Sequence, residues 1–107
     1  MTKEQILKVV KDETGVDLTD RDNVRSKHTP NLFARYAAIV LMHEEGHKPE
    51  DIASLFELHR TAIYYALISI NSLLETNKQF KKMYLACIKR IAENESNNET
   101  NVYATAS

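Results

Sequence analysis

Residues 43–47, His-Glu-Glu-Gly-His, match the H-E-x-x-H pattern in which two histidines bind zinc and the first glutamate acts as general base. That chemistry needs both histidines on one face of a continuous helix. Gly46 lies inside the motif and Pro49 follows it, so the helix is expected to end before the second histidine. No strong third ligand follows, and 107 residues leave little room for a substrate cleft. We therefore predict no metal site, no cofactor and no enzymatic activity.

Residues 48–70 read KPEDIASLFELHRTAIYYALISI and are the most informative stretch. A short amphipathic helix, a tight turn and a second helix make up the helix-turn-helix plan. Ala53 is small where the helices cross, Leu58 is expected to plug the turn into the core, and Ile63 is expected to anchor the second helix. Glu57 replaces the usual glycine of the turn. The outer face of the second helix can enter a DNA major groove, and it carries His59, Arg60, Thr61, Tyr64, Tyr65 and Ile68.

Alternatives stay open for this stretch. The two helices could be an ordinary antiparallel pair within a bundle. Tyr64 and Tyr65 could be partly buried against that bundle instead of contacting DNA. The polar cluster at residues 59–61 favours DNA binding, because a bundle helix has no need of it.

Five helices are predicted to position these residues, so the fold class is all-α. They cover about residues 3–14, 29–45, 49–56, 59–74 and 76–93. Thr2 with Gln5, and Thr76 with Gln79, are capping-box patterns that start the first and fifth helices. The polar stretch 16–28 is predicted to be a loop.

The domain organisation follows from the same pattern. Residues 1–93 form one helical domain, a five-helix bundle that contains the helix-turn-helix. Residues 94–107 are polar and acidic and have no apolar period, so they are predicted to be a disordered tail.

The composition excludes several other classes of protein. Two glycines and two prolines are too few for the many turns of a β-sandwich or barrel. The single cysteine, Cys87, excludes an internal disulfide framework and a cysteine-based zinc finger. No apolar run approaches the ~20 residues of a membrane span, and residues 1–5 lack a signal-peptide core. Without a phosphate-binding G-x-x-x-x-G-K-S/T loop either, we expect a cytoplasmic protein with no membrane or nucleotide partner.

The net charge of -1 does not by itself favour a nucleic-acid binder, but its distribution does. Residues 23–43 contain Arg25, Lys27 and Arg35 and no acid, and residues 58–74 contain Arg60 and no acid. The acids gather in other segments and in the tail. A basic face with an acidic back is therefore indicated. The same distribution of charged residues would also be found on two ordinary solvated surfaces.

These segments resemble the C-terminal DNA-binding domain of the bacterial replication initiator DnaA, which has a Trp-repressor-like fold. The similarity covers about residues 3–92, in the same order of elements. It rests on I-L-K-V-V (6–10), the basic loop around Arg25 and Lys27, A-R-Y-A-A-I-V-L (34–41), P-E-D-I-A-S-L-F (49–56) and T-A-I-Y-Y-A (61–66). The family's Gly-Gly-Arg-Asp-His-Thr-Thr signature is replaced by E-L-H-R-T-A (57–62), one residue shorter after Phe56.

The resemblance implies binding of double-stranded DNA by a regulator of replication or transcription. It implies that helix 59–74 enters the major groove and that the basic loop 21–28 lies at the minor groove and backbone. Lys27 matches the family's minor-groove arginine, and Arg35 matches a phosphate-contacting arginine. Thr61 matches a base-contacting threonine, and Arg60 stands in place of the neighbouring histidine. The full predicted DNA-binding set is Arg25, Lys27, His28, Arg35, Lys48, His59, Arg60, Thr61, Tyr64 and Tyr65.

A non-catalytic protein-interaction module, an adaptor or anti-repressor on the same scaffold, is the alternative function. The net charge of -1, the acidic tail and the adjacent tyrosines favour a protein partner. The oligomeric state stays open: a single recognition helix with few cations indicates weak DNA binding by a monomer, and a homodimer would bind half-sites about one helical turn apart.

Overall fold

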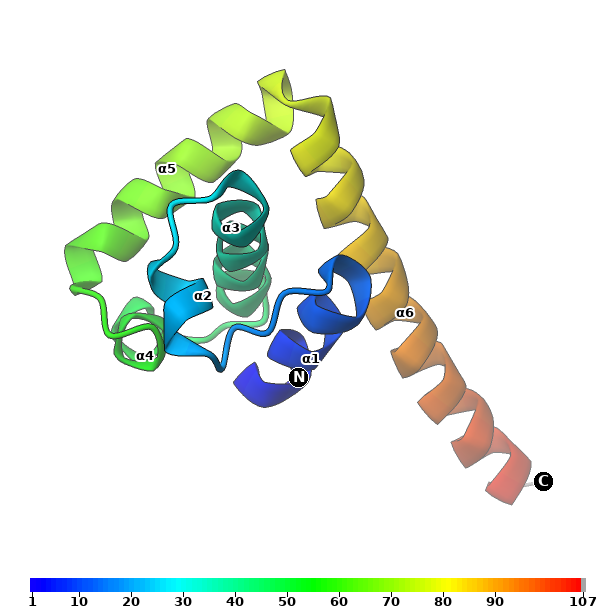
Figure 1. The fold of residues 1–107 in the computed structure, drawn as a ribbon. Helices are drawn as coiled ribbons and strands as arrows, with labels where there is room; N and C mark the ends of the chain where they lie inside the picture. Colours follow the sequence, from blue (N-terminus) through cyan, green and yellow to red (C-terminus); the bar gives the residue numbers. More distant parts are fainter. Residues whose placement is uncertain (107) are drawn as a thin grey trace.

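Six helices make up the part of the chain that the structure, a computed structural model, describes: residues 1–94 with their side chains, and the backbone onward to residue 106 (Figure 1). The helices are α1 (Lys3–Thr14), α2 (Arg21–Arg25), α3 (Thr29–Glu44), α4 (Pro49–Leu55), α5 (Arg60–Thr76) and α6 (Lys78–Ala106). These residues contain no strand, and the all-α prediction is confirmed. No helix among them is long and apolar enough to cross a lipid bilayer.

Helix α3 is the centre of the fold and contacts each of the other helices (Figure 1). Its sequence is apolar around most of its circumference, which is typical of a helix enclosed by neighbours. Its buried side chains are Ala34, Ala37, Ala38, Ile39, Val40, Leu41 and Met42. Ile6 and Val10 of α1, Ile63 and Ile70 of α5, and Phe80 of α6 complete the core around it. The predicted inward position of Ile63 is therefore confirmed.

The ends of α1 form as the sequence predicts. The Thr2 side chain accepts a hydrogen bond from the Gln5 amide at 3.1 Å, and the Gln5 side chain accepts one from the Thr2 amide at 2.8 Å. Gly15 stops the helix in a left-handed conformation with φ 78°. Both ends are thus fixed by local hydrogen bonds that satisfy otherwise unpaired backbone groups.

The prediction of five helices is wrong in two places. The segment predicted as a loop contains α2, a helix of five residues that Asp20 caps by accepting a hydrogen bond from the Asp22 amide. So short a helix has no apolar period that a sequence could reveal. The boundary before α6 is also shifted, because Thr76 belongs to α5 and Asn77 caps the next helix through the Phe80 amide.

Helix α6 runs along α1 and then projects beyond the other helices (Figure 1). Its backbone is helical to residue 106, whereas the sequence predicts a disordered tail over residues 94–107. That stretch contains no proline or glycine that would end a helix. The side chains of residues 95–107 lie outside the described residues, and the predicted disorder of the tail stays a prediction.

Candidate nucleic-acid interface

Helix α4, a short turn and α5 form a helix-turn-helix, and backbone hydrogen bonds fix the turn. The Glu57 amide donates to the Ser54 carbonyl at 3.2 Å, and the Leu58 amide donates to the Ala53 carbonyl at 2.8 Å. This pair of bonds is the Schellman closure of a helix end, which requires a left-handed residue at the position of Glu57. Glu57 has φ 56°, the only positive φ outside glycine in the described part of the chain.

The two helices pack through small and branched side chains. Ile52 and Ala53 of α4 and Ile63 of α5 are buried, which confirms the predicted close crossing. The expectation for Leu58 is wrong, because its side chain is 39% exposed. Phe56, only 3% exposed, fills the core below the turn instead. The left-handed residue at position 57 turns the chain outward, so the Leu58 amide closes the turn while its side chain stays at the surface.

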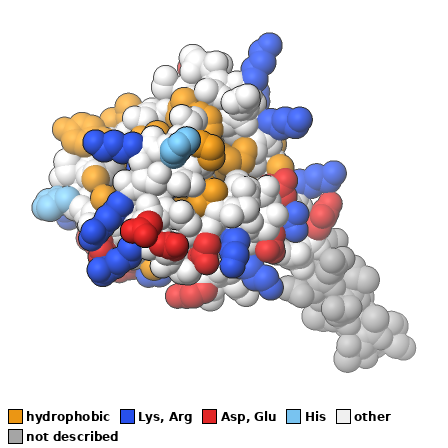
Figure 2. Space-filling model, viewed as in Figure 1, with side chains coloured by type: hydrophobic (Ala, Val, Ile, Leu, Met, Phe, Trp, Pro, Cys, Tyr) orange, Lys and Arg blue, Asp and Glu red, His pale blue; other side chains and the backbone are white. Residues whose placement is uncertain are grey.

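The outer face of α5 is exposed, as the sequence predicts. Thr61 is exposed, and the exposed fractions of Tyr64, Tyr65 and Ile68 are 49%, 67% and 66%. Tyr65 is therefore mostly exposed, whereas Tyr64 is about half exposed. Figure 2 shows hydrophobic side chains along the edge of the molecule occupied by α5, and Lys and Arg mixed with Asp and Glu over α2 and α4. The face is free of acidic residues from Arg60 to Leu74.

Arg60, the residue expected to contact bases, begins α5 and pairs with an acid of α4. Its Nη1 lies 3.2 Å from Oε1 of Glu50, and both side chains are more than half exposed. The pKa of Glu50 is lowered, first by a hydrogen bond from its own backbone amide and then by the Arg60 guanidinium. Glu50 is thus held charged at the N-terminus of α4, where the helix dipole also favours a carboxylate.

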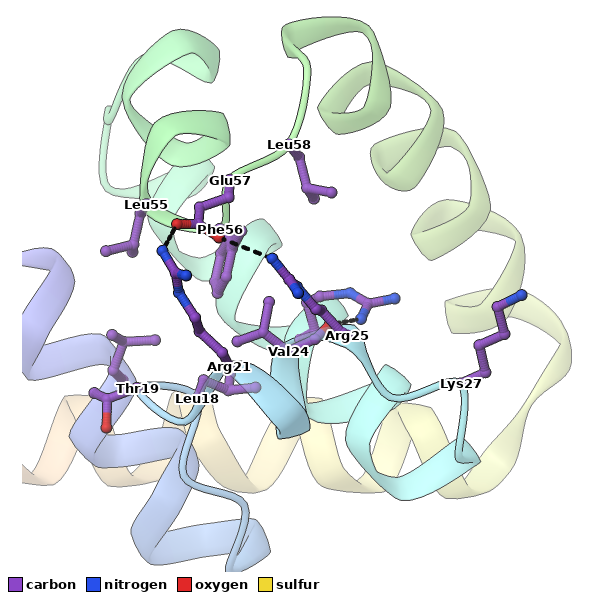
Figure 3. Close-up of a pocket in the computed structure, with 12 residues that line it drawn as sticks. Leu18, Thr19, Arg21, Val24, Arg25, Lys27, Leu55, Phe56, Glu57 and Leu58 are labelled. Carbon is purple, nitrogen blue, oxygen red and sulfur yellow. Dashed lines mark hydrogen bonds and ion pairs between the residues drawn. The ribbon is translucent and has the colours of Figure 1, made fainter.

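A cavity of about 580 Å³ lies on the other side of the turn, between α2 and the end of α4 (Figure 3). Arg21 and Arg25 project from α2 toward Glu57 and hold its carboxylate from two directions. Arg21 bonds Oε1, and Nη2 of Arg25 lies 3.6 Å from Oε2. Lys27 and Arg35 line the same cavity. The structure thus brings together three predicted phosphate contacts, Arg25, Lys27 and Arg35.

Arg35 has a second role within the fold. It is half-buried in α3, and its Nη1 donates a hydrogen bond to the carbonyl of Val24 in the last turn of α2. A guanidinium at a helix C-terminus satisfies a carbonyl that has no partner within the helix. Arg35 therefore positions α2 against α3, which the sequence did not predict.

The remaining predicted residues are exposed but lie further from the turn or at helix ends. His28 caps α3 and His59 caps α5, and neither cap uses the imidazole. Lys48 precedes α4 at the end opposite the turn, and neither His28 nor Lys48 lines the cavity beside α2. The predicted residues around the turn thus form one compact group, and His28 and Lys48 lie at its margin.

Sequence reasoning missed Arg21, Glu50 and Glu57 as members of this surface. Arg21 and Arg25 are one helical turn apart, a spacing that signals a shared face only once residues 21–25 are recognised as a helix. Glu57 is 36 residues from Arg21 in the chain, so only the tertiary fold shows the pair.

The H-E-x-x-H residues are placed as the sequence predicts. Helix α3 ends at Glu44, and Gly46 has φ 88°, so His43 and His47 do not share a continuous helix. His47 Nε2 lies 2.9 Å from the Met1 carbonyl oxygen. Among the residues with described side chains, no three His, Cys, Asp or Glu gather in a group that could hold a metal ion.

Comparison of the chain with protein-family models, with curated proteins and with solved structures gives no match.

Proposed function

We propose that this protein binds double-stranded DNA without catalysing a reaction, and that it uses α5 as its recognition helix. The observation that carries the proposal is the exposed, acid-free outer face of α5, which begins at Arg60 and Thr61 and follows a helix-turn-helix turn. A helix presented in this way can lie in a major groove with its N-terminal residues at base edges. The resemblance of the sequence to the DnaA DNA-binding domain supports the same assignment.

The roles of the cations follow from where they lie around the turn. Arg25 and Lys27, with Arg35 behind them, flank the turn on the α2 side and contact phosphates, which sets the register of the protein on the duplex. Arg60 and Thr61 contact base edges, and arginine is the natural bidentate partner of guanine. The proposed role is regulation of replication or transcription, on a Trp-repressor-like scaffold.

The acids beside these cations are compatible with DNA binding. The ion pairs of Glu57 and Glu50 are exposed, and exposed pairs are weak because water screens them. Phosphates can replace these carboxylates around Arg25 and Arg60 when DNA approaches. The two acids also lower the positive potential of the free protein, so the affinity for random DNA should be modest.

The test is affinity measurement of variants on a DNA site chosen from a random pool and on an unrelated duplex. Arg60→Ala should lose ~1–3 kcal/mol of discrimination, whereas Lys27→Ala should weaken binding to both duplexes alike. Lys82→Ala, on exposed α6, is the matched control and should change neither value. Equal losses on both duplexes for Arg60→Ala and Lys27→Ala would refute this division of roles.

A protein partner is the second candidate, and one observation favours it. Tyr64, Tyr65 and Ile68 form an exposed apolar strip on α5, and such side chains are enriched at protein interfaces. This alternative predicts no salt-dependent DNA affinity. It also predicts self-association or partner binding that Ile68→Lys abolishes, which sedimentation analysis would detect.

A further inference from the structure

The cavity between α2 and the helix-turn-helix turn has the size and the lining of a small-molecule site. Its volume of about 580 Å³ falls within the roughly 300–1,000 Å³ typical of ligand pockets. Its apolar wall comes from α1, from α2 and the loop before it, and from the end of α4 with its turn: Leu7, Leu18, Val24, Leu55, Phe56 and Leu58. Leu58 is partly exposed, so part of this wall is open to an incoming molecule. Figure 3 shows Leu58 among the residues that line the cavity.

The charge of the cavity selects the kind of molecule. Its lining residues include a single acid, Glu57, and four cations: Arg21, Arg25, Lys27 and Arg35. A cavity lined by mostly one sign of charge attracts the opposite sign. An anionic group attached to an apolar body therefore fits both the charge and the wall.

Glu57 shows how these arginines hold a carboxylate. Arg21 and Arg25 reach the two oxygens of that group from the same face of α2 (Figure 3). All three side chains are exposed, so exchanging Glu57 for another carboxylate breaks only exposed ion pairs. The guanidinium groups are already placed for a carboxylate ligand, and little reorganisation is needed.

We propose that this cavity binds a small monocarboxylate with an apolar tail. Its carboxylate lies between Arg21 and Arg25 in the place of the Glu57 side chain, and its tail lies against Leu55 and Leu58. This site shares Arg25, Lys27 and Arg35 with the proposed phosphate contacts but does not include the residues of α5 proposed to contact bases. Its test needs no DNA, so its failure and the failure of the DNA proposal are distinguishable.

A second cavity provides an internal control. It has a volume of about 390 Å³ and lies between the end of α1, the start of α3 and α6, where Phe33 and Met83 give it an apolar lining. Its charged lining residues are one acid, Glu13, and one cation, Lys82. With balanced charge, it should not prefer an anionic ligand over a neutral one of the same length.

In the experiment, octanoate is titrated into the full chain labelled with nitrogen-15. Nuclear magnetic resonance signals of the backbone amides report the binding. Octanol supplies the same chain without the charge, and acetate supplies the charge without the chain. Octanoate should shift the amides of α2 and residues 56–58, with an affinity about fivefold or more above that of either control. Arg25→Gln should weaken octanoate binding about fivefold, and Glu57→Gln should strengthen it because the competing carboxylate is gone. Lys82→Gln should leave it unchanged.

Several results would overturn the proposal. They are equal binding of octanol and octanoate, equal binding of acetate and octanoate, shifts centred on Phe33 and Met83, or octanoate binding that neither Arg25→Gln nor Glu57→Gln alters. The amide spectrum of each variant without ligand shows whether it is folded. If Arg25→Gln does not fold, Glu57→Gln decides the question, and unchanged or weaker binding by that variant refutes the site.

Discussion

The left-handed residue in the helix-turn-helix turn gives a stability prediction that is specific to this geometry. Glu57 has φ 56°, a conformation that costs an L-amino acid roughly 1–2 kcal/mol and glycine almost nothing. Replacement by glycine removes that strain, but it also removes the ion pairs with Arg21 and Arg25. The informative comparison is therefore between Glu57→Gly and Glu57→Ala, because both variants lack the carboxylate.

The difference between these variants can be worked out from two opposing effects. Glycine avoids the left-handed strain of roughly 1–2 kcal/mol. Glycine also has more conformational freedom in the unfolded chain, which lowers its stability relative to alanine by roughly 0.5–1 kcal/mol. Glu57→Gly should therefore be about 1 kcal/mol more stable than Glu57→Ala, or about 4 °C higher in Tm for a chain of this size.

Urea and thermal unfolding followed by circular dichroism would measure this difference. Urea titration gives the free energy of unfolding of each variant, and a common slope shows that the unfolded states are comparable. If Glu57→Ala is instead more stable than Glu57→Gly by roughly 0.5–1 kcal/mol, the entropy of glycine acts without left-handed strain, and the described conformation of position 57 is wrong.

Three further predictions concern other parts of the fold. Gly46→Ala should be destabilised by about 1 kcal/mol, because φ is 88° there and left-handed strain outweighs the smaller conformational freedom of alanine in the unfolded chain. An added Cβ meets only open space, so no clash contributes, and unchanged urea unfolding would contradict this prediction. Burial, and then the charge of Glu13, raises the pKa of Cys87 to about 11, so the thiol should react with a disulfide reagent at pH 8 only after denaturation; rapid reaction of the native protein would contradict this. Hydrogen bonds from the Thr19 side chain and then the Thr19 amide lower the pKa of Asp17 below 3.8. The charged Asp17 therefore stabilises the folded state above the unfolded pKa, and this stabilisation is lost as the pH falls. Between about pH 5 and pH 2, Asp17→Asn should lose less stability than the parent chain. Equal losses in urea titrations of the two proteins would contradict this prediction.

The helix ends that depend only on neighbouring residues were predictable from the sequence. The capping box at Thr2 and the glycines at positions 15 and 46 fix helix ends through neighbouring residues, so no tertiary information was needed. Ile63 was recognisable because apolar residues at helical spacing face the core. The same logic identified the exposed face of α5.

The missed features depend on contacts between distant segments or on a very short helix. The five residues of α2 are too few to show periodicity, so Arg21 was not recognised as a partner of Arg25. The helix-turn-helix plan identified Glu57 as the residue in place of the turn glycine, but it did not show that the left-handed conformation there leaves the Leu58 side chain at the surface. The pairing of Glu57 with α2 appears only after the chain has folded.

The measurement that tests the central proposal most directly is fluorescence anisotropy of the chain with a random pool of double-stranded DNA at two salt concentrations. If Arg25, Lys27 and Arg35 each neutralise one phosphate, the affinity should fall about 40-fold between roughly 50 and 200 mM salt. The variant Lys27→Ala should show a shallower dependence on salt, by about one unit of slope. Absence of binding at low salt, or an affinity that salt does not change, would contradict DNA binding by this protein.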